Sequence, residues 1–234
     1  MNEIRKVSVV VPVFNEEGNV EPLVEEIAAV MNQQNPEWEL WLVDDGSTDA
    51  SLARIRTVCE REPHAGFLSF RRNRGQSAAF GAGFEAATGD VIVTLDADLQ
   101  NDPADIPTLL DMYRQGFDMV IGWRVTRRDD SARRFASRVG NAVRNALTAE
   151  IVHDTGCSLK VMRTSMARRL PMFRGMHRFL PTLMKMYGAK VAEVPVKYGA
   201  FSRGWAASQD LLAVNWMLRR YRPGEVTERR APHV

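Results

Sequence analysis

The sequence has little cysteine and no long hydrophobic run. Only two of its 234 residues are cysteines, Cys59 and Cys157, and neither belongs to a Cys-x-x-Cys pair. This excludes a disulfide scaffold and argues against a zinc site or a redox motif. It also favours a reducing compartment. No stretch approaches the roughly 18 apolar residues of a membrane span, and the N-terminus lacks the charged and then apolar pattern of a signal peptide. We therefore expect no transmembrane segment.

Several common catalytic signatures are also missing. There is no Gly-x4-Gly-Lys-Ser/Thr loop, which argues against a P-loop nucleotidase. Four histidines without a nucleophile-elbow motif give no basis for a Ser/His/Asp triad. Residues 81–86 fit the Gly-x-Gly-x-x-Ala pattern of a dinucleotide-binding oxidoreductase, but they lie inside an Ala-rich helical stretch with no strand directly before it. We interpret these glycines as close-packing positions of a helix.

The composition and the charge distribution indicate a globular domain with a basic second half. The chain is 45% hydrophobic and 26% charged, which excludes collagen-like and disordered classes. Residues 1–117 carry 9 Lys and Arg against 20 Asp and Glu, whereas residues 118–234 carry 22 against 9. The basic half either binds an anionic partner, such as phosphates, a nucleic acid or an anionic membrane, or is a solvated surface without a partner. A nucleic-acid partner is not expected, since aromatic stacking motifs and a docking helix are missing.

Apolar runs alternate with helical periodicity along the first half of the chain. Strands are predicted at residues 7–13, 39–43, 66–70, 90–95 and 118–122, and helices at 19–31, 47–59, 77–87 and 103–113. This alternation predicts an α/β fold with a mostly parallel sheet. The second half predicts helices at 131–147, 177–187 and 210–222, a strand at 190–196, and a frayed tail from residue 223. We expect a catalytic domain over 1–209 and a basic amphipathic helix with its tail over 210–234.

Polar side chains follow these predicted strands, where ligands bind on parallel sheets. Asp96 and Asp98 come directly after an apolar strand, and carboxylates at i and i+2 point to the same side of an extended chain. Their repulsion is relieved by a divalent cation, and oxygen ligands suit Mg²⁺ or Mn²⁺, with Gln100 as a neutral third donor. Asp44 and Asp45 end the second strand, where they either bind a nucleoside or simply form a turn and helix cap.

Four ordered motifs resemble family 2 glycosyltransferases of the GT-A (Rossmann-like) fold. The motifs are residues 9–17 (VVVPVFNEE), 43–49 (VDDGSTD), 72–79 (RNRGQSAA) and 89–103 ending in DADLQNDP. Residues 122–124, 154–160 and 177–181 are similar to further segments of the polyprenyl-phosphate glycosyltransferases, the group that contains dolichol-phosphate mannosyltransferase. The resemblance extends from about residue 7 to 200.

The resemblance implies a role for individual residues. The base, ribose and sugar of a nucleotide sugar would be held by Pro12, Phe14, Glu16, Val43, Asp45, Asp96, Ala97 and Arg124. The metal would be held by Asp96, Asp98 and Gln100. Catalytic roles would fall to Asp98, Asp154 and Arg124, and the acceptor phosphate would meet Arg133 and Arg203, the latter in a shifted register of the family's C-terminal motif.

The resemblance also implies a reaction and a location. The expected enzyme is an inverting, metal-dependent hexosyltransferase that moves a sugar from a UDP-sugar or GDP-mannose to undecaprenyl or dolichyl phosphate. The alternatives are transfer to a polysaccharide or glycan hydroxyl, for which Asp154 would be the base, and a catalytically weak nucleotide-sugar-binding protein. The expected partners are the donor, the lipid acceptor and a membrane surface on the cytoplasmic side, with a second copy of the chain as a further candidate.

Overall fold

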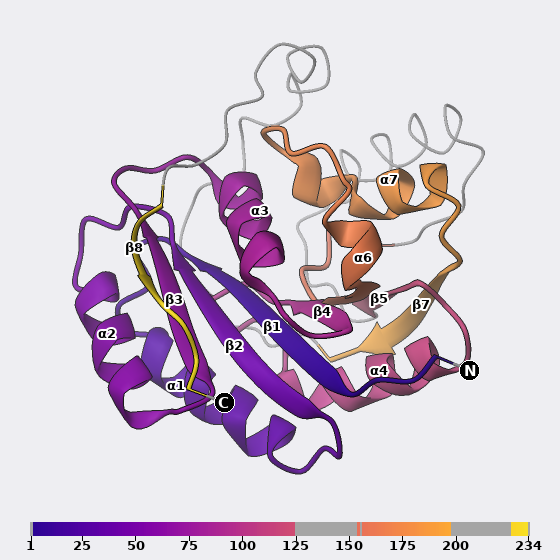
Figure 1. Ribbon diagram of the computed structural model, residues 1–234, viewed down its shortest axis with the longest axis horizontal. Helices are drawn as coiled ribbons and strands as arrows, with labels where there is room; N and C mark the ends of the chain where they lie inside the picture. Colours follow the sequence, from indigo (N-terminus) through magenta and orange to yellow (C-terminus); the bar gives the residue numbers. More distant parts are fainter. Residues whose placement is uncertain (1, 125–153, 155, 198–225, 234) are drawn as a thin grey trace, which may run out of the picture.

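A mixed β-sheet lies at the centre of the molecule (Figure 1). The computed structural model describes residues 2–124, 154, 156–197 and 226–233, and among these eight strands form one sheet in the order β7-β5-β6-β4-β1-β2-β3-β8. The strands are β1 (Lys6–Val13), β2 (Glu37–Asp44), β3 (Ala65–Phe70), β4 (Val91–Thr94), β5 (Met119–Arg124), β6 (Lys160–Arg163), β7 (Val191–Val196) and β8 (Val226–Arg230). Only β6 and β8 run antiparallel to their neighbours, which confirms the predicted mostly parallel sheet.

Helices cover both faces of this sheet (Figure 1). The helices are α1 (Val20–Met31), α2 (Ser51–Arg61), α3 (Gln76–Ala86), α4 (Ile106–Arg114), α6 (Thr164–Ala167) and α7 (Leu180–Met186), with 3-10 turns η1 (Pro103–Asp105) and η2 (Met176–Arg178). α1, α2 and α4 pack on one face, and α3, α6 and α7 on the other. Strands covered on both faces bury most of their side chains, which is why five of the eight residues of β1 are valines. Within the described ranges no helix is long and apolar enough to cross a bilayer.

The glycines of α3 allow the helix to lie close to its neighbours. A Cβ at Gly83 would overlap the side chain of Val10 in β1, and one at Gly81 would lie 3.1 Å from Met172. Their place inside a helix confirms that these glycines serve packing and do not form a dinucleotide-binding turn.

Helix α2 begins later than predicted because the residues before it are used elsewhere. The sequence placed its start among Ser47, Thr48 and Asp49, but the helix begins at Ser51. The Ser47 hydroxyl accepts a hydrogen bond from the backbone N–H of Asn15, and the N–H of Thr48 donates to the Asn15 side chain. These bonds join two loops, so the chain turns into a helix only after them.

The C-terminal residues form a strand, so the prediction of a frayed tail is wrong. β8 pairs antiparallel with β3, the Thr227 hydroxyl donates to the Ser69 carbonyl at 3.0 Å, and Arg56 forms an ion pair with Glu228. The Arg229 guanidinium lies 5.4 Å from the centre of the Trp41 ring. Charged side chains suit an exposed edge strand, and this is why the segment looks like a polar tail in the sequence.

Other differences are local. β6 and α6 were not predicted, because a four-residue helix shows no periodicity and β6 begins and ends with a charged residue, unlike the apolar run of β4. The helix predicted over 177–187 is divided into η2 and α7, with Phe179 between them. The helices predicted at 131–147 and 210–222 lie outside the described residues.

A buried carboxylate connects three segments of the fold. Glu39 in β2 accepts hydrogen bonds from the Ser8 hydroxyl at 2.6 Å and from the backbone N–H of Thr88 at 2.5 Å, and its carboxylate lies 3.3 Å from the Lys6 ammonium. Burial by itself would raise the pKa of Glu39, but these hydrogen bonds and the lysine outweigh it and lower the pKa. The ionised carboxylate therefore stabilises the folded state.

Replacing Glu39 with alanine is expected to cost about 3 kcal/mol of unfolding free energy, because it leaves buried donors and a cation unpaired. The lowered folded pKa means that the carboxylate's contribution is present above the unfolded pKa and is lost as pH falls through the folded pKa. Urea unfolding between pH 3 and pH 7 tests this. The matched variant Glu37→Ala, at the exposed start of the same strand, should change little, and equal effects of the two substitutions would contradict the assignment.

Candidate functional site

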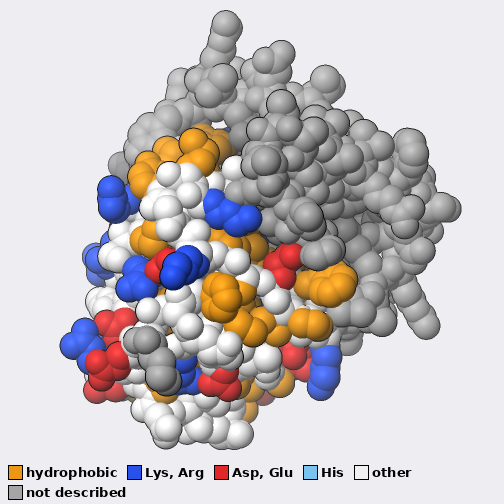
Figure 2. All heavy atoms as spheres, turned by 90° about the vertical axis from the view of Figure 1, so that its right-hand side faces the viewer, with side chains coloured by type: hydrophobic (Ala, Val, Ile, Leu, Met, Phe, Trp, Pro, Cys, Tyr) orange, Lys and Arg blue, Asp and Glu red, His pale blue; other side chains and the backbone are white. Residues whose placement is uncertain are grey.

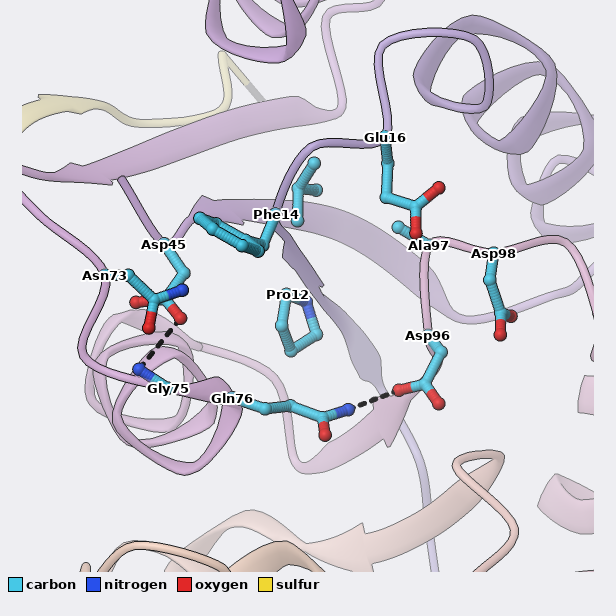
Figure 3. Close-up of a pocket in the computed structure, with 11 residues that line it drawn as sticks. Pro12, Phe14, Glu16, Asp45, Asn73, Gly75, Gln76, Asp96, Ala97 and Asp98 are labelled. Carbon is cyan, nitrogen blue, oxygen red and sulfur yellow. Dashed lines mark hydrogen bonds between the residues drawn. The ribbon is translucent and has the colours of Figure 1, made fainter. Parts of the chain in front are cut away.

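A cavity of about 280 Å³ opens at the carboxyl ends of β1, β2 and β4, beside the start of α3 (Figure 3). It is lined by Pro12, Val13, Phe14, Glu16, Asp45, Asn73, Gly75, Gln76, Asp96, Ala97 and Asp98. The carboxyl edge of a parallel sheet is where ligands bind in α/β folds. The cavity therefore lies where the sequence predicted a site.

Most of the predicted donor and metal residues meet in this cavity: Pro12, Phe14, Glu16, Asp45, Asp96, Ala97 and Asp98. Val43 does not line it, because its side chain is fully buried inside β2. Gln100 lies beside the cavity, and its backbone N–H donates to Asp98 Oδ1 at 3.1 Å. Arg133 and Arg203 lie outside the described residues.

Two loops are joined at one wall of the cavity. Asn15 has a φ of 55°, a left-handed conformation that asparagine tolerates better than most residues. Its side-chain oxygen accepts the N–H of Thr48 at 2.8 Å, and the next N–H, of Glu16, donates to the Ser51 hydroxyl at 2.8 Å. These bonds fix the segment that carries Phe14 and Glu16. Phe14 keeps 43% of its surface exposed, so its ring is free to stack on a planar ligand.

Asp45 lies deep in the cavity and is held by the loop after β3. Backbone N–H groups of Arg74 and Gly75 donate to its two oxygens at 2.7 and 2.9 Å. Burial raises the pKa of Asp45, and the two hydrogen bonds oppose that shift. Gly75 has a φ of 90°, which only glycine adopts without strain. The loop therefore fixes the carboxylate and leaves its remaining lone pairs for a ligand.

Asp96 and Asp98 form a pair of carboxylates on the opposite side of the cavity. Burial, and then the charge of Asp98, raise the pKa of Asp96 to about 6. Burial also raises the pKa of Asp98. The Gln76 amide donates to Asp96 Oδ1 at 2.5 Å (Figure 3). Two buried or partly buried carboxylates this close, one of which opposes the ionisation of the other, are stabilised by a positive charge between them.

This pair suits a divalent cation that is coordinated by the protein and by a bound substrate at the same time. The described residues contain no group of three or more His, Cys, Asp or Glu able to hold a metal ion. Mg²⁺ is commonly bound by one or two carboxylates together with substrate phosphates and water. The donor set of Asp96 and Asp98 therefore suits a cation bound jointly with a phosphorylated ligand.

Arg124 and Asp154 form a second charged group, at the end of β5. The Arg124 guanidinium binds both oxygens of Asp154, through Nε at 2.5 Å and Nη2 at 2.8 Å. Both side chains are nearly buried, with exposed fractions of 9% and 7%. The pair does not line the cavity, but the Arg124 charge acts on both Asp96 and Asp98. A buried, paired arginine beside two carboxylates suits a site that handles phosphate charge.

Three further residues belong to this region and were not assigned from the sequence. Gln76 contacts Asp96 directly, and its only signal was its place in the RNRGQSAA motif. The Ser158 hydroxyl accepts the backbone N–H of Asp96 at 3.2 Å. Lys160 is 4% exposed and donates to the Cys157 carbonyl. Burial lowers its pKa, and the charges of Asp96 and Asp154 oppose that shift.

Comparison with protein families matches this chain to Glycosyl transferase family 2 over residues 8–170. The dodecaprenyl-phosphate galacturonate synthase of Rhizobium johnstonii is 40% identical, over 94% of this chain and 69% of that protein. The undecaprenyl-phosphate 4-deoxy-4-formamido-L-arabinose transferase of Pectobacterium carotovorum is 36% identical, over 93% and 67%.

Solved structures show a similar fold. The glucosyl-3-phosphoglycerate synthase of Mycobacterium tuberculosis, in complex with Mn²⁺ and UDP-glucose, superposes with a TM-score of 0.68. The likeness covers 86% of this chain and 72% of that one at 21% identity. The shared architecture agrees with the predicted Rossmann-like arrangement of the sheet and its helices.

Proposed function

Because this chain belongs to glycosyl transferase family 2, we propose that it transfers a sugar from a nucleotide diphosphate sugar to a polyprenyl phosphate. The observation that carries the proposal is the convergence of Asp45, Asp96 and Asp98 in one cavity at the carboxyl edge of the sheet. The names of the two relatives contain dodecaprenyl phosphate and undecaprenyl phosphate, which supports the acceptor class. The Mn²⁺ and UDP-glucose complex of the structural neighbour supports a metal-dependent donor site, with UDP as the first nucleotide to test.

The cavity has two ends with different chemistry. Phe14 would stack on the base and Asp45 would accept hydrogen bonds from the base or ribose, while Glu16 lines the same cavity. At the other end, Asp96 and Asp98 would hold Mg²⁺ or Mn²⁺, with Gln100 beside them. When bound, such a cation neutralises the charge that develops on the departing diphosphate.

The ion pair between Arg124 and Asp154 favours a phosphate acceptor over a hydroxyl acceptor. A lipid phosphate oxygen is already ionised at pH 7, so it needs no strong base to attack the anomeric carbon. The new carbon–oxygen bond forms on the face opposite the breaking bond to the diphosphate, with inversion. Both oxygens of Asp154 are bound by Arg124. In this arrangement Asp154 therefore orients the arginine side chain. A hydroxyl acceptor would require Asp154 as a free base.

A lipid acceptor places the enzyme at a membrane surface, and we propose peripheral contact. Residues 155–192 contain seven Lys and Arg besides the buried Lys160, and no Asp or Glu. In this region Met186 is 77% exposed and Tyr187 43%. Figure 2 shows hydrophobic side chains next to Lys and Arg side chains on the side of the molecule that carries α7. Basic residues near an anionic membrane each contribute about 1 kcal/mol.

Binding of the donor is tested by thermal unfolding with UDP-sugars and GDP-sugars, each with and without Mn²⁺. A nucleotide at about 100 times its Kd stabilises the fold by about 2.7 kcal/mol, which is a rise in Tm of roughly 5–10 °C for a chain of this size. We expect this rise only with the metal present, and NAD⁺ serves as the control for a dinucleotide-binding protein. A rise with NAD⁺ and none with any nucleotide sugar would overturn the donor assignment.

Acceptor choice is tested with the donor that gives the largest rise. Labelled sugar should appear in the organic phase when undecaprenyl phosphate is supplied. Transfer to a glycan hydroxyl but not to the lipid would support the alternative acceptor. Donor binding without transfer to either would indicate a nucleotide-sugar-binding protein without catalysis.

A further inference from the structure

The loop between β4 and η1 carries both candidate metal-binding carboxylates in a strained conformation. It runs from Asp96 to Asn101, and Leu99 in its middle has a φ of 57°. A non-glycine residue in this left-handed region costs free energy, and it persists only where the surroundings hold the backbone in place. Contacts outside the loop must therefore define its shape.

One hydroxyl group holds both ends of this loop. Ser158 Oγ accepts the backbone N–H of Asp96 at 3.2 Å and the side-chain amide of Asn101 at 2.6 Å. Ser158 and Asn101 are buried, with exposed fractions of 7% and 5%. Ser158 is itself fixed to the sheet, because the Thr94 hydroxyl donates to its carbonyl at 2.6 Å. The loop is thus closed at its base by a residue that lies about 60 positions later in the sequence.

One member of the second charged pair lies close to Ser158 in the sequence. Asp154 lies four residues before Ser158 and binds Arg124 at the end of β5. The carbonyl of Leu159, the residue after Ser158, accepts the N–H of Gly122 at 2.9 Å, which is a second connection to β5. Asp154, Ser158 and Leu159 together therefore link the carboxylate loop to β5 and its arginine.

We infer that Ser158 is a positioning residue that sets the carboxylates of Asp96 and Asp98 in the geometry needed for a cation shared with the donor diphosphate. The inference rests on the proposed function, since that function supplies the cation and the diphosphate. Ser158 touches neither of them and acts through the loop. Residues that orient the ligands of a metal commonly change metal affinity or activity by roughly 10- to 100-fold when they are removed.

The test compares Ser158→Ala with Thr164→Val. Thr164 lies just after the other end of β6, and its buried hydroxyl donates to the Gly89 carbonyl at 2.7 Å, so its loss also removes one buried hydrogen bond. Each purified chain is titrated with Mn²⁺ in the presence of UDP by calorimetry, and its unfolding is measured in urea without metal. We expect Ser158→Ala to weaken Mn²⁺ binding by roughly 10-fold or more, and Thr164→Val to lower stability while leaving Mn²⁺ binding unchanged.

A second variant keeps the inference testable if Ser158→Ala folds poorly. Asn101→Ala removes the other partner of the same hydroxyl and should weaken Mn²⁺ binding in the same direction. In the double variant the two losses should not add, because they share one hydrogen bond. Mn²⁺ affinity in Ser158→Ala equal to that of Thr164→Val would overturn the inference. A wild-type chain that binds no UDP with Mn²⁺ would instead contradict the proposed function, and that outcome is visible before any variant is made.

Discussion

Replacing Asp96 with asparagine is expected to reduce sugar transfer by about 1,000-fold, because the site loses a charged oxygen ligand at the point where diphosphate charge develops. The stability of the metal-free fold should not fall. Burial and the neighbouring Asp98 raise the pKa of Asp96 to about 6, so keeping this carboxylate ionised at neutral pH costs the folded state free energy relative to the unfolded state. An uncharged side chain of the same shape removes that cost. The expected variant is inactive with an unchanged or higher Tm.

Transfer rates and thermal unfolding, each with and without Mn²⁺, measure both parts of this result. Asp111→Asn is the matched control, since Asp111 is exposed on α4 and does not line the cavity. It should leave the rate and the Mn²⁺-dependent rise in Tm unchanged. Wild-type turnover in Asp96→Asn would remove this carboxylate from the mechanism.

Replacing Arg124 with methionine is expected to lower both activity and stability. The substitution leaves Asp154 buried without its bidentate partner, and breaking a buried ion pair from one side costs about 3–5 kcal/mol. We expect transfer to fall by at least about 100-fold, because a donor aimed at developing charge contributes about that much. Urea unfolding and the transfer assay give the two values separately.

The double variant Arg124→Met, Asp154→Leu separates charge from packing. Replacing both members of a buried pair by apolar side chains is often neutral for stability, so we expect the double variant to recover most of the lost unfolding free energy and none of the activity. Arg163→Met is the control for a partly exposed pair, since Arg163 binds Asp118 with 37% of its own side chain exposed. If the double variant regains transfer together with stability, Arg124 serves the fold alone.

The predicted residues that line the cavity are those whose positions follow directly from the direction of the strands. Asp45 and Asp96 directly follow two strands that run parallel in the sheet. Because the carboxyl ends of parallel strands lie at the same edge, the proximity of these two residues could be predicted without coordinates. Val43 did not reach the cavity because β2 is buried on both faces, which leaves no alternation in the sequence to show where a side chain points. Gln76 and Ser158 were not assigned because their roles depend on contacts 20 and 62 residues away.

The second half of the chain was predicted less well for a related reason. β6 and β8 are short and antiparallel, and they join the sheet beside strands that lie far from them in sequence. No local pattern of four or five residues identifies such a partner. The polar tail became a strand because the open edge of β3 offered backbone groups to pair with.

The sequence by itself determined the α/β class, the order of most strands and helices, and the acidic residues that end the strands, because hydrophobic periodicity and turn chemistry are local properties of a chain. Only the tertiary structure decided that Arg124 binds Asp154, that Gln76 reaches Asp96, and that Ser158 closes the carboxylate loop. Those contacts depend on which buried polar groups face one another once the sheet is assembled. Each must find a partner there, and the choice of partner is made by packing.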